Sequence, residues 1–154
     1  MKNILILGIG NDILQDDGIG IRLVQDLQKK DFPPGTRFET TSLGGLEILE
    51  MIKDFETVII LDAIKTRGGI PGDIYTYTPD DFRETLHLTN LHDINFLTSL
   101  ELAKRVGIRV PDEIRIIAVE IIEDREFGSD LTPEMNKKYP EILRSVKRIL
   151  TSYL

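Results

Sequence analysis

The sequence predicts a three-layer α/β fold in which a mostly parallel sheet lies between two layers of helices. Two segments, residues 4–7 and 57–61, are apolar throughout except for Thr57 and are typical of strands that are buried on both faces. Segments with apolar residues at helical spacing alternate with these runs, and that alternation is typical of a parallel sheet. The length of 154 residues, without an internal repeat or a linker, indicates a single domain that spans residues 1–154.

In the first half of the chain, glycine residues separate the predicted elements. A first helix begins at Gly18, after which apolar residues recur at helical spacing. A second helix follows Gly44 and Gly45 and precedes the strand that stops at Asp62. The predicted strands of this half are residues 4–7, 38–42 and 57–61.

In the second half, Ile74 and Thr76 alternate with Tyr75 and Tyr77, a pattern that predicts a strand at residues 73–78. This strand follows the one at 57–61 with no helix between them. We therefore expect these two strands to form an antiparallel pair, with residues 73–78 at an edge of the sheet. A helix that ends at Gly107 then leads to the last predicted strand, at residues 113–119.

The last predicted helix begins at Thr132-Pro133-Glu134, where a capping threonine precedes a proline at the first helical position. A proline inside a helix lacks a backbone N–H group and clashes with the preceding turn, so we expect Pro140 to break or restart this helix. Beyond Pro140, one apolar stripe runs from Ile142 to Tyr153.

The composition narrows the classes of function that the chain can carry. With a net charge of -7, the chain lacks the concentrated Lys and Arg needed to bind nucleic acid phosphates, whereas it allows a cationic metal or a basic protein partner. The absence of cysteine excludes disulfides, thiolate metal sites and a cysteine nucleophile. No apolar stretch approaches the roughly 18 residues that span a bilayer, and the amino terminus lacks a signal-peptide pattern. We therefore expect a cytoplasmic monomer without nucleic acid or membrane partners.

Asp17, Asp62 and His92 are the strongest candidates for chemistry. Each lies where a loop leaves a regular element, and Asp62 directly follows the apolar run at residues 57–61. Ligands of open α/β sheets bind at the carboxyl ends of the strands, so these two carboxylates and one imidazole can meet at one rim of the sheet. Such a set suits a divalent metal with an open coordination position.

Each candidate acid also has a purely structural explanation. Asp16 and Asp17 precede a helix whose amino terminus favours negative charge, and Asp12 and Asp16 can be solvated loop acids. Asp62 can be the acid of a cap or turn. A lone histidine is likewise more often structural than a metal ligand, so the metal hypothesis depends on the joint pattern.

Two other functions of α/β domains fit these residues less well. Gly8-Ile9-Gly10 begins like a dinucleotide-binding fingerprint, but Ile13 stands where the third glycine belongs and the helix begins late. A phospho-receiver domain would carry its acidic pair near the end of the first strand and a lysine at the end of the last. Here Asp16 and Asp17 come well after the first strand, and the last strand ends without a lysine. No serine has the surroundings of a nucleophile elbow.

The stretch from Gly8 to Gly20, with Gly10-Asn11 and Asp16-Asp17-Gly18, closely resembles the opening motif of the hydrogenase maturation proteases. These endopeptidases trim the C-terminus of the large subunit of NiFe hydrogenases. The resemblance spans nearly the whole chain and continues at Ile60-Leu61-Asp62-Ala63, Pro71-Gly72-Asp73-Ile74, His92 and Leu131-Thr132-Pro133-Glu134. The stretch Thr78-Pro79-Asp80-Asp81-Phe82 and Asp17 are more similar to the branch that serves formate hydrogenlyase-type and other membrane-bound hydrogenases.

The resemblance implies a twisted five-stranded sheet and a nickel-dependent endopeptidase. Its substrate would be a NiFe hydrogenase large-subunit precursor, whose C-terminal extension is removed after nickel insertion. Nickel would arrive with the precursor and bind the residues that match the family's ligands, Asp17, Asp62 and His92. Asp16 is a possible assisting acid in the cleavage. The alternative function is a non-proteolytic metal-binding or chaperone-like partner of the large subunit.

Two departures from the family pattern bear on the chemistry. Asp17 stands where many relatives carry glutamate, and its shorter reach can shift the metal geometry. The stretch at residues 40–45 lacks the acid that some relatives place after the second strand. The resemblance therefore supplies no accessory catalytic acid at that position.

Overall fold

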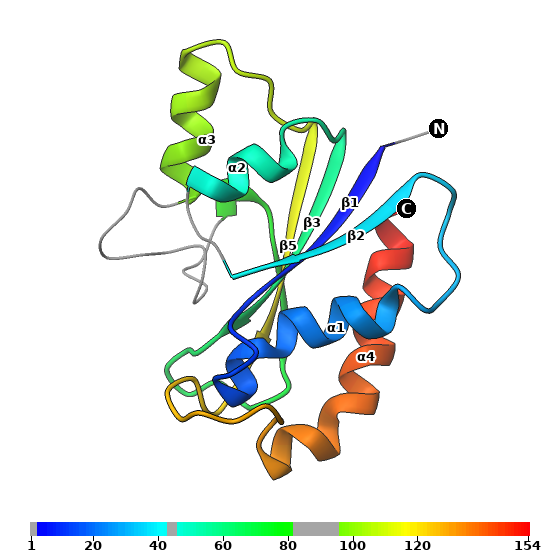
Figure 1. Ribbon diagram of the computed structural model, residues 1–154, viewed down its shortest axis with the longest axis vertical. Helices are drawn as coiled ribbons and strands as arrows, with labels where there is room; N and C mark the ends of the chain where they lie inside the picture. The colour runs from blue at the N-terminus through cyan, green and yellow to red at the C-terminus, as the bar shows by residue number, and fades with distance from the viewer. Residues whose placement is uncertain (1–2, 43–45, 82–95) are drawn as a thin grey trace.

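The computed structural model describes residues 3–42, 46–81 and 96–154 and shows a five-stranded sheet between helices (Figure 1). The strand order is β2-β1-β3-β5-β4, in which β1 pairs in parallel with β2 and β3, and β3 pairs in parallel with β5. The strands are β1 (Ile4–Ile9), β2 (Thr36–Thr41), β3 (Thr57–Ile64), β4 (Ile74–Tyr77) and β5 (Glu113–Glu120). The helices are η1 (Gln15–Gly18), α1 (Ile19–Leu27), α2 (Leu46–Ile52), η2 (Pro79–Asp81), α3 (Phe96–Arg105) and α4 (Pro133–Tyr153). The predicted α/β class, the mostly parallel sheet and the antiparallel edge strand are confirmed.

The predicted partner of the edge strand is wrong. β4 lies at the edge and is antiparallel, as expected, but it pairs with β5 and not with β3. β3 and β5 are almost entirely buried, so each is an inner strand with a neighbouring strand on both sides. The short β4 is partly exposed, which suits an edge position.

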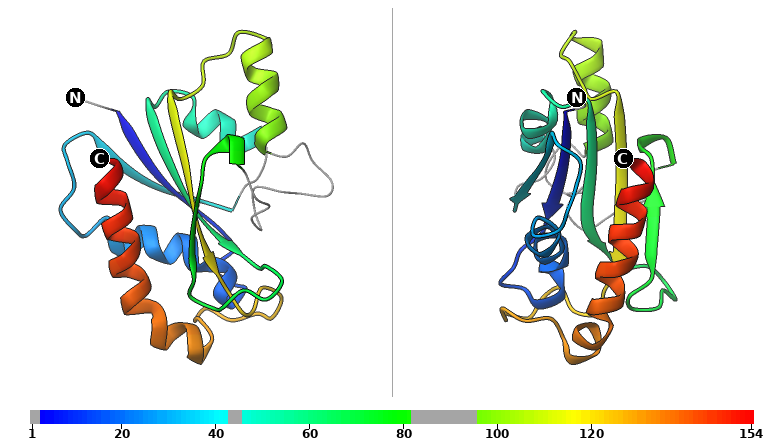
Figure 2. Two further views of the ribbon diagram at one scale, coloured as in Figure 1. Left: turned by 180° about the vertical axis from the view of Figure 1, so that it is seen from behind. Right: turned by 90° about the vertical axis from the view of Figure 1, so that its right-hand side faces the viewer.

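The two faces of the sheet carry separate hydrophobic clusters, because successive residues of a strand point to opposite faces. One face packs against α1 and α4, and the other packs against α2 and α3 (Figure 2). The first cluster includes Ile59 and Leu61 of β3, and the second includes Val58 and Ile60 of the same strand. Among the described residues, no helix is long and apolar enough to cross a membrane.

Pro140 does not break the last helix, contrary to expectation. α4 runs without interruption through 21 residues from Pro133 to Tyr153. Pro140 and Asn136, whose carbonyl loses its hydrogen bond, lie on the exposed side of the helix. The opposite side buries Met135 and Tyr139 before the proline and Ile142 after it. Burial on both sides of the proline therefore outweighs the lost hydrogen bond.

Close backbone contacts bring α1 onto the sheet. A Cβ atom at Gly20 would lie 2.4 Å from the carbonyl oxygen of Leu61 and 2.6 Å from that of Ile9. A Cβ atom at Gly8 would lie 2.3 Å from the carbonyl oxygen of Gly20. The absence of these side chains lets the first turn of α1 rest directly on β1 and β3. This contact places the loop before α1 at the ends of both strands.

We expect Gly20→Ala to lower the free energy of unfolding by about 2 kcal/mol, because the added methyl group overlaps two backbone carbonyls. Helix propensity alone would change stability in the opposite direction, since alanine is the better helix former by up to ~1 kcal/mol. Urea denaturation measures the difference. Gln25→Ala, at an exposed position of the same helix, is the control and should change stability by less than ~0.5 kcal/mol. A Gly20→Ala protein more stable than the wild type would contradict the close contact.

Candidate functional site

The carboxyl ends of β1, β3 and β5 meet at one edge of the sheet, as they must when parallel strands are neighbours. Three loops surround this edge: residues 10–18 after β1, residues 65–73 after β3 and residues 121–132 after β5 (lower part of Figure 1). We call the strand ends and these three loops the carboxyl rim. Ligands of open α/β sheets bind at such rims.

Asp62 lies inside β3, two residues before its end, and is 1% exposed. The predicted strand ended at Leu61. The observed strand is longer because Asp62 pairs with Ala118 of β5 and the pairing continues to Ile64. Asp62 lies on the same face as Ile60, toward α2 and α3. Its Oδ1 accepts a hydrogen bond from the backbone N–H of Ala63 at 2.8 Å, which helps to fix the carboxylate.

Asp17 lies on η1 and is also buried. Its Oδ2 accepts a hydrogen bond from the backbone N–H of Asn11 at 3.0 Å. A Cβ atom at Gly10 would lie 2.5 Å from the carbonyl oxygen of Asp17, so the loop after β1 folds closely over η1. Because η1 contacts β3, Asp17 and Asp62 belong to the same part of the carboxyl rim. Two of the three predicted site residues are therefore brought to one end of the sheet.

His92, the third predicted site residue, lies outside the described residues. Across residues 3–42, 46–81 and 96–154, no group of three or more His, Cys, Asp or Glu side chains is spaced to hold a metal ion. The described part of the candidate site therefore consists of two buried carboxylates. Carboxylate oxygens are suitable ligands for a divalent cation, and an imidazole would extend the set toward nickel or zinc.

Asp16 is fully buried, so its interpretation as a solvated loop acid is wrong. Its carboxylate accepts hydrogen bonds from the backbone N–H groups of Ile122 at 3.3 Å, Glu123 at 3.0 Å and Thr132 at 2.8 Å. It also accepts one from the Thr132 hydroxyl at 2.9 Å. This hydroxyl makes no capping bond to α4, although Thr132 is the residue before the helix. Asp16 thus joins the loop after β1 to the loop after β5.

Backbone hydrogen bonds reinforce the same connection. The N–H of Gln15 donates to the carbonyl of Gly128 at 2.9 Å, and the N–H of Gly128 donates to the carbonyl of Ile13 at 2.9 Å. Gln15 adopts a φ of 49, which is uncommon for a residue other than glycine. The neighbouring residues Asp16 and Asp17 therefore make different contacts. Asp16 binds residues 122–132, and Asp17 binds the backbone of Asn11.

Glu120 is a fourth buried carboxylate at the rim, after Asp16, Asp17 and Asp62, and sequence reasoning missed it. It lies two residues after Ala118, the partner of Asp62, and so faces the same side of the sheet as Asp62. Its carboxylate accepts hydrogen bonds from the backbone N–H of Thr66 at 2.8 Å, from the Thr66 hydroxyl and from the Tyr75 hydroxyl at 3.1 Å. The sequence did carry a signal, because an acid also follows the apolar run that ends at Val119.

The Glu120 contacts hold the loop after β3 against the sheet. A hydrogen bond with Thr66 lowers the pKa of Tyr75, but burial and the Glu120 carboxylate together raise that pKa above its ordinary value. A Cβ atom at Gly69 would lie 1.7 Å from Oε1 of Glu120, so the loop packs directly on the carboxylate. The observed contacts of Glu120 thus hold residues 65–73 against the end of β5.

We expect Glu120→Ala to lower the free energy of unfolding by about 2 kcal/mol, because it removes the acceptor of the Thr66 and Tyr75 donors. Thermal or urea denaturation measures this loss. Glu126→Ala removes an exposed acid from the next loop and should leave stability within ~0.5 kcal/mol of the wild type. Equal stability of the two variants would show that the Glu120 contacts do not hold the loop.

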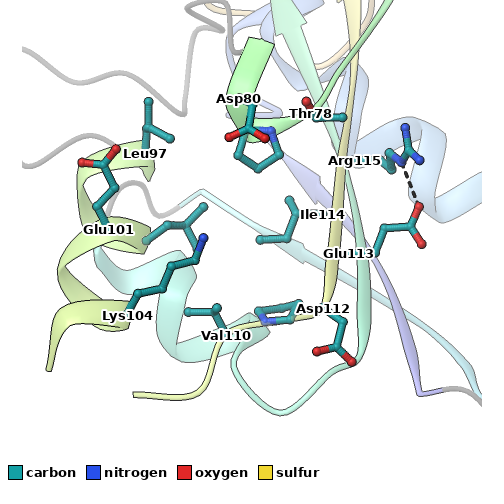
Figure 3. A pocket seen from close by; sticks show the side chains of 13 residues that line it. Thr78, Asp80, Leu97, Glu101, Lys104, Val110, Asp112, Glu113, Ile114 and Arg115 are labelled. Atoms are coloured by element: carbon teal, nitrogen blue, oxygen red, sulfur yellow. Dashed lines mark hydrogen bonds and ion pairs between the residues drawn. The ribbon is translucent and has the colours of Figure 1, made fainter. Parts of the chain in front are cut away.

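A cavity of about 460 Å³ lies at the other end of the sheet, between α3 and the amino end of β5 (Figure 3). Leu97, Val110 and Ile114 form its apolar part. Charges of both signs surround it, and Arg115 is paired with Glu113 at 2.9 Å. Neither Asp17 nor Asp62 lines this cavity. The cavity and the buried acids of the carboxyl rim are therefore separate features of the structure.

Comparison with known proteins assigns the chain to one family. The model of the family described as hydrogenase maturation protease matches residues 21–150, a range that includes Asp62 and His92 and begins after Asp17. The hydrogenase expression/formation protein HoxM of Azotobacter vinelandii is 31% identical over 150 residues, which cover 92% of this chain and 69% of that protein. For HupM of Azotobacter chroococcum, 31% identical over 137 residues, the shares are 84% and 62%. The chain thus spans about two thirds of the length of these relatives.

Shorter relatives and solved structures give the same result. The hydrogenase 2 maturation protease of Escherichia coli is 26% identical over 145 residues, which cover 93% of this chain and 87% of that protein. The structure of the hydrogenase maturating endopeptidase HybD from Escherichia coli superposes with a TM-score of 0.73. That likeness has 25% identity and covers 99% of this chain and 94% of the other.

Proposed function

Because this chain belongs to the hydrogenase maturation protease family, we propose that it is the endopeptidase that removes the C-terminal extension of a NiFe hydrogenase large-subunit precursor. The observation that carries this proposal is the burial of Asp17 and Asp62 at one rim of the sheet, in a chain of this family. Carboxylate oxygens are suitable ligands for a divalent cation, so two of them at the rim on which ligands of such sheets bind suit a metal carried by a substrate.

The metal in this proposal is nickel, and it belongs to the substrate. Nickel already inserted into the precursor would bind Asp17, Asp62 and His92 when the precursor docks. Carboxylate and imidazole are suitable nickel ligands, and three protein ligands leave positions for groups of the precursor or for water. The backbone N–H groups of Asn11 and Ala63 orient the two carboxylates, in the way that outer partners orient metal ligands.

Two routes to cleavage follow from the same ligands. The metal of the docked precursor can polarise the scissile carbonyl or activate a water molecule. Alternatively, the metal serves only for docking, and a nearby acid such as Asp16 assists the cleavage. The four donors that surround the Asp16 carboxylate favour a positioning role for it, through the loop that also carries Asp17.

The alternative function is a metal-binding or chaperone-like partner of the large subunit that does not cut it. HupM and HoxM are named hydrogenase expression/formation proteins, a name that states no proteolysis and so accommodates this alternative. Incubation with nickel-loaded precursor, followed by intact-mass measurement, separates the two functions. The endopeptidase hypothesis predicts that the precursor loses the mass of a C-terminal peptide. An unchanged precursor mass in a stable complex would favour the non-proteolytic partner.

A further inference from the structure

Large apolar side chains are exposed at two opposite ends of the described structure. Phe127 is 80% exposed and Ile13 is 54% exposed, and both lie in loops of the carboxyl rim. A second group lies at and just beyond the end of α3, where Val106 is 62% exposed. Figures 1 and 2 place residues 121–132 at the end of the molecule away from α3. Exposed apolar patches of this kind mark sites of protein association.

Phe127 and Ile13 are presented by a fixed backbone. Gly128, the residue after Phe127, exchanges backbone hydrogen bonds with Ile13 and Gln15, so Phe127 lies next to the loop that carries Ile13. On the other side of Phe127, the Glu123 carboxylate accepts hydrogen bonds from the N–H groups of Arg125 at 2.8 Å and Glu126 at 3.0 Å. An aromatic side chain on an ordered loop loses little entropy on binding, which is typical of interface hot spots.

The charge beside these two residues indicates what kind of partner fits. A cleft of about 340 Å³ lies between the loop after β1 and residues 129–131, and Asp12 and Asp130 line it. Both acids are exposed, and neither has an ion pair or a side-chain hydrogen bond within the described part of the chain. Asp12 directly precedes Ile13, and Asp130 follows Phe127 by three positions.

The other charged groups of the cleft already have partners within the fold. Asp26 accepts a hydrogen bond from the Tyr139 hydroxyl, and the Arg22 guanidinium lies 4.4 Å from the centre of the Tyr139 ring. Arg22 also donates to the Asn136 side chain at 3.4 Å. The lining carries three carboxylates, Asp12, Asp26 and Asp130, against the one guanidinium of Arg22, so its net charge is negative, next to two exposed apolar side chains.

We propose that Ile13, Phe127, Asp12 and Asp130 form a docking surface for a segment of the precursor in which an apolar residue adjoins a lysine or arginine. We call these four residues the Phe127 surface. The proposal rests on the proposed function, because the precursor is the occupant. The surface adjoins the loop that carries Asp17, so a protein of ordinary interface size that docks there also covers the rim. The residues that bind the precursor would then differ from the residues that take part in its cleavage, although both sets lie on one rim.

The test measures how tightly purified nickel-loaded precursor binds the protein and how its processing depends on precursor concentration. Phe127→Ser should raise Kd and KM roughly 30-fold, as for the loss of an aromatic hot spot, with kcat unchanged. Asp12→Lys combined with Asp130→Lys should also weaken binding and should reduce its dependence on salt. Val106→Ser, which removes another exposed apolar side chain at the far end, is the control and should bind as the wild type does.

The outcomes distinguish this proposal from the proposed function. Wild-type cleavage together with an unchanged Kd and KM for Phe127→Ser would overturn the docking surface alone. An equal loss of binding in Phe127→Ser and Val106→Ser would also overturn it. Failure of the wild type to bind the precursor would overturn both proposals. A wild-type dimer that becomes monomeric in Phe127→Ser, seen by sedimentation velocity, would assign the surface to a second copy of the chain instead.

Discussion

Replacing Asp62 with asparagine is expected to lower the rate of processing of nickel-loaded precursor by at least about 100-fold while the protein stays folded. Even the loss of an outer partner of a metal ligand costs 10- to 100-fold, so the loss of a ligand charge should reach the upper end of that range. Asparagine keeps the size of the side chain and an oxygen that can accept the 2.8 Å hydrogen bond from the Ala63 N–H. The change therefore removes the charge with little disturbance of β3.

Asp73→Asn provides the matched control for Asp62→Asn. Asp73 is an exposed aspartate at the same rim, immediately before β4, and it should tolerate the change without loss of processing. The rate is measured from the intact mass of the precursor over time, and folding is followed by thermal denaturation. Processing by Asp62→Asn at the wild-type rate would remove Asp62 from the site.

Asp16→Ala is expected to have the largest effect on stability, a loss of about 3 kcal/mol in the free energy of unfolding. The substitution leaves the N–H groups of Ile122, Glu123 and Thr132 without their acceptor, and each buried donor left unpaired costs about 1–3 kcal/mol. Water that enters the space left by the carboxylate can pair with some of these N–H groups, so we expect a loss smaller than the largest sum of the three costs. Urea denaturation measures the loss directly.

Asp12→Ala is the control for Asp16→Ala, because it removes an exposed aspartate from the same loop and should change stability by less than ~0.5 kcal/mol. Processing should fall in Asp16→Ala together with stability, since the loop that holds Asp17 is no longer tied to residues 122–132. Unchanged stability combined with lost processing would favour the other role of Asp16, as an acid that assists the cleavage.

The elements that could be predicted from the sequence are those whose pattern is set by burial alone. β1 and β3 appear as apolar runs because both of their faces are covered, and α1 shows helical spacing because one of its faces is covered. The pairing of β4 with β5 could not be predicted, because it depends on which strand competes for the edge of β3. The continuity of α4 through Pro140 likewise depends on packing on both sides of the proline.

The residues of the candidate site could likewise be predicted from the sequence only in part. Asp62 could be singled out because an acid interrupts an apolar run, but the same pattern occurs at Glu120. Only the structure separates them, because it shows the Thr66 and Tyr75 donors around Glu120. Asp16 and Asp17 are also equivalent in sequence, and their different contacts arise from a loop that is more than one hundred residues away in the chain. Long-range contacts of this kind leave no local pattern.

We propose that Asp17, Asp62 and His92 recognise nickel carried by the precursor and that this recognition permits cleavage. The most direct measurement compares the rates at which the protein cleaves nickel-loaded and nickel-free forms of one precursor, read from intact mass. We predict cleavage of the nickel-loaded form and no detectable cleavage of the nickel-free form. Equal rates for the two forms would contradict the claim.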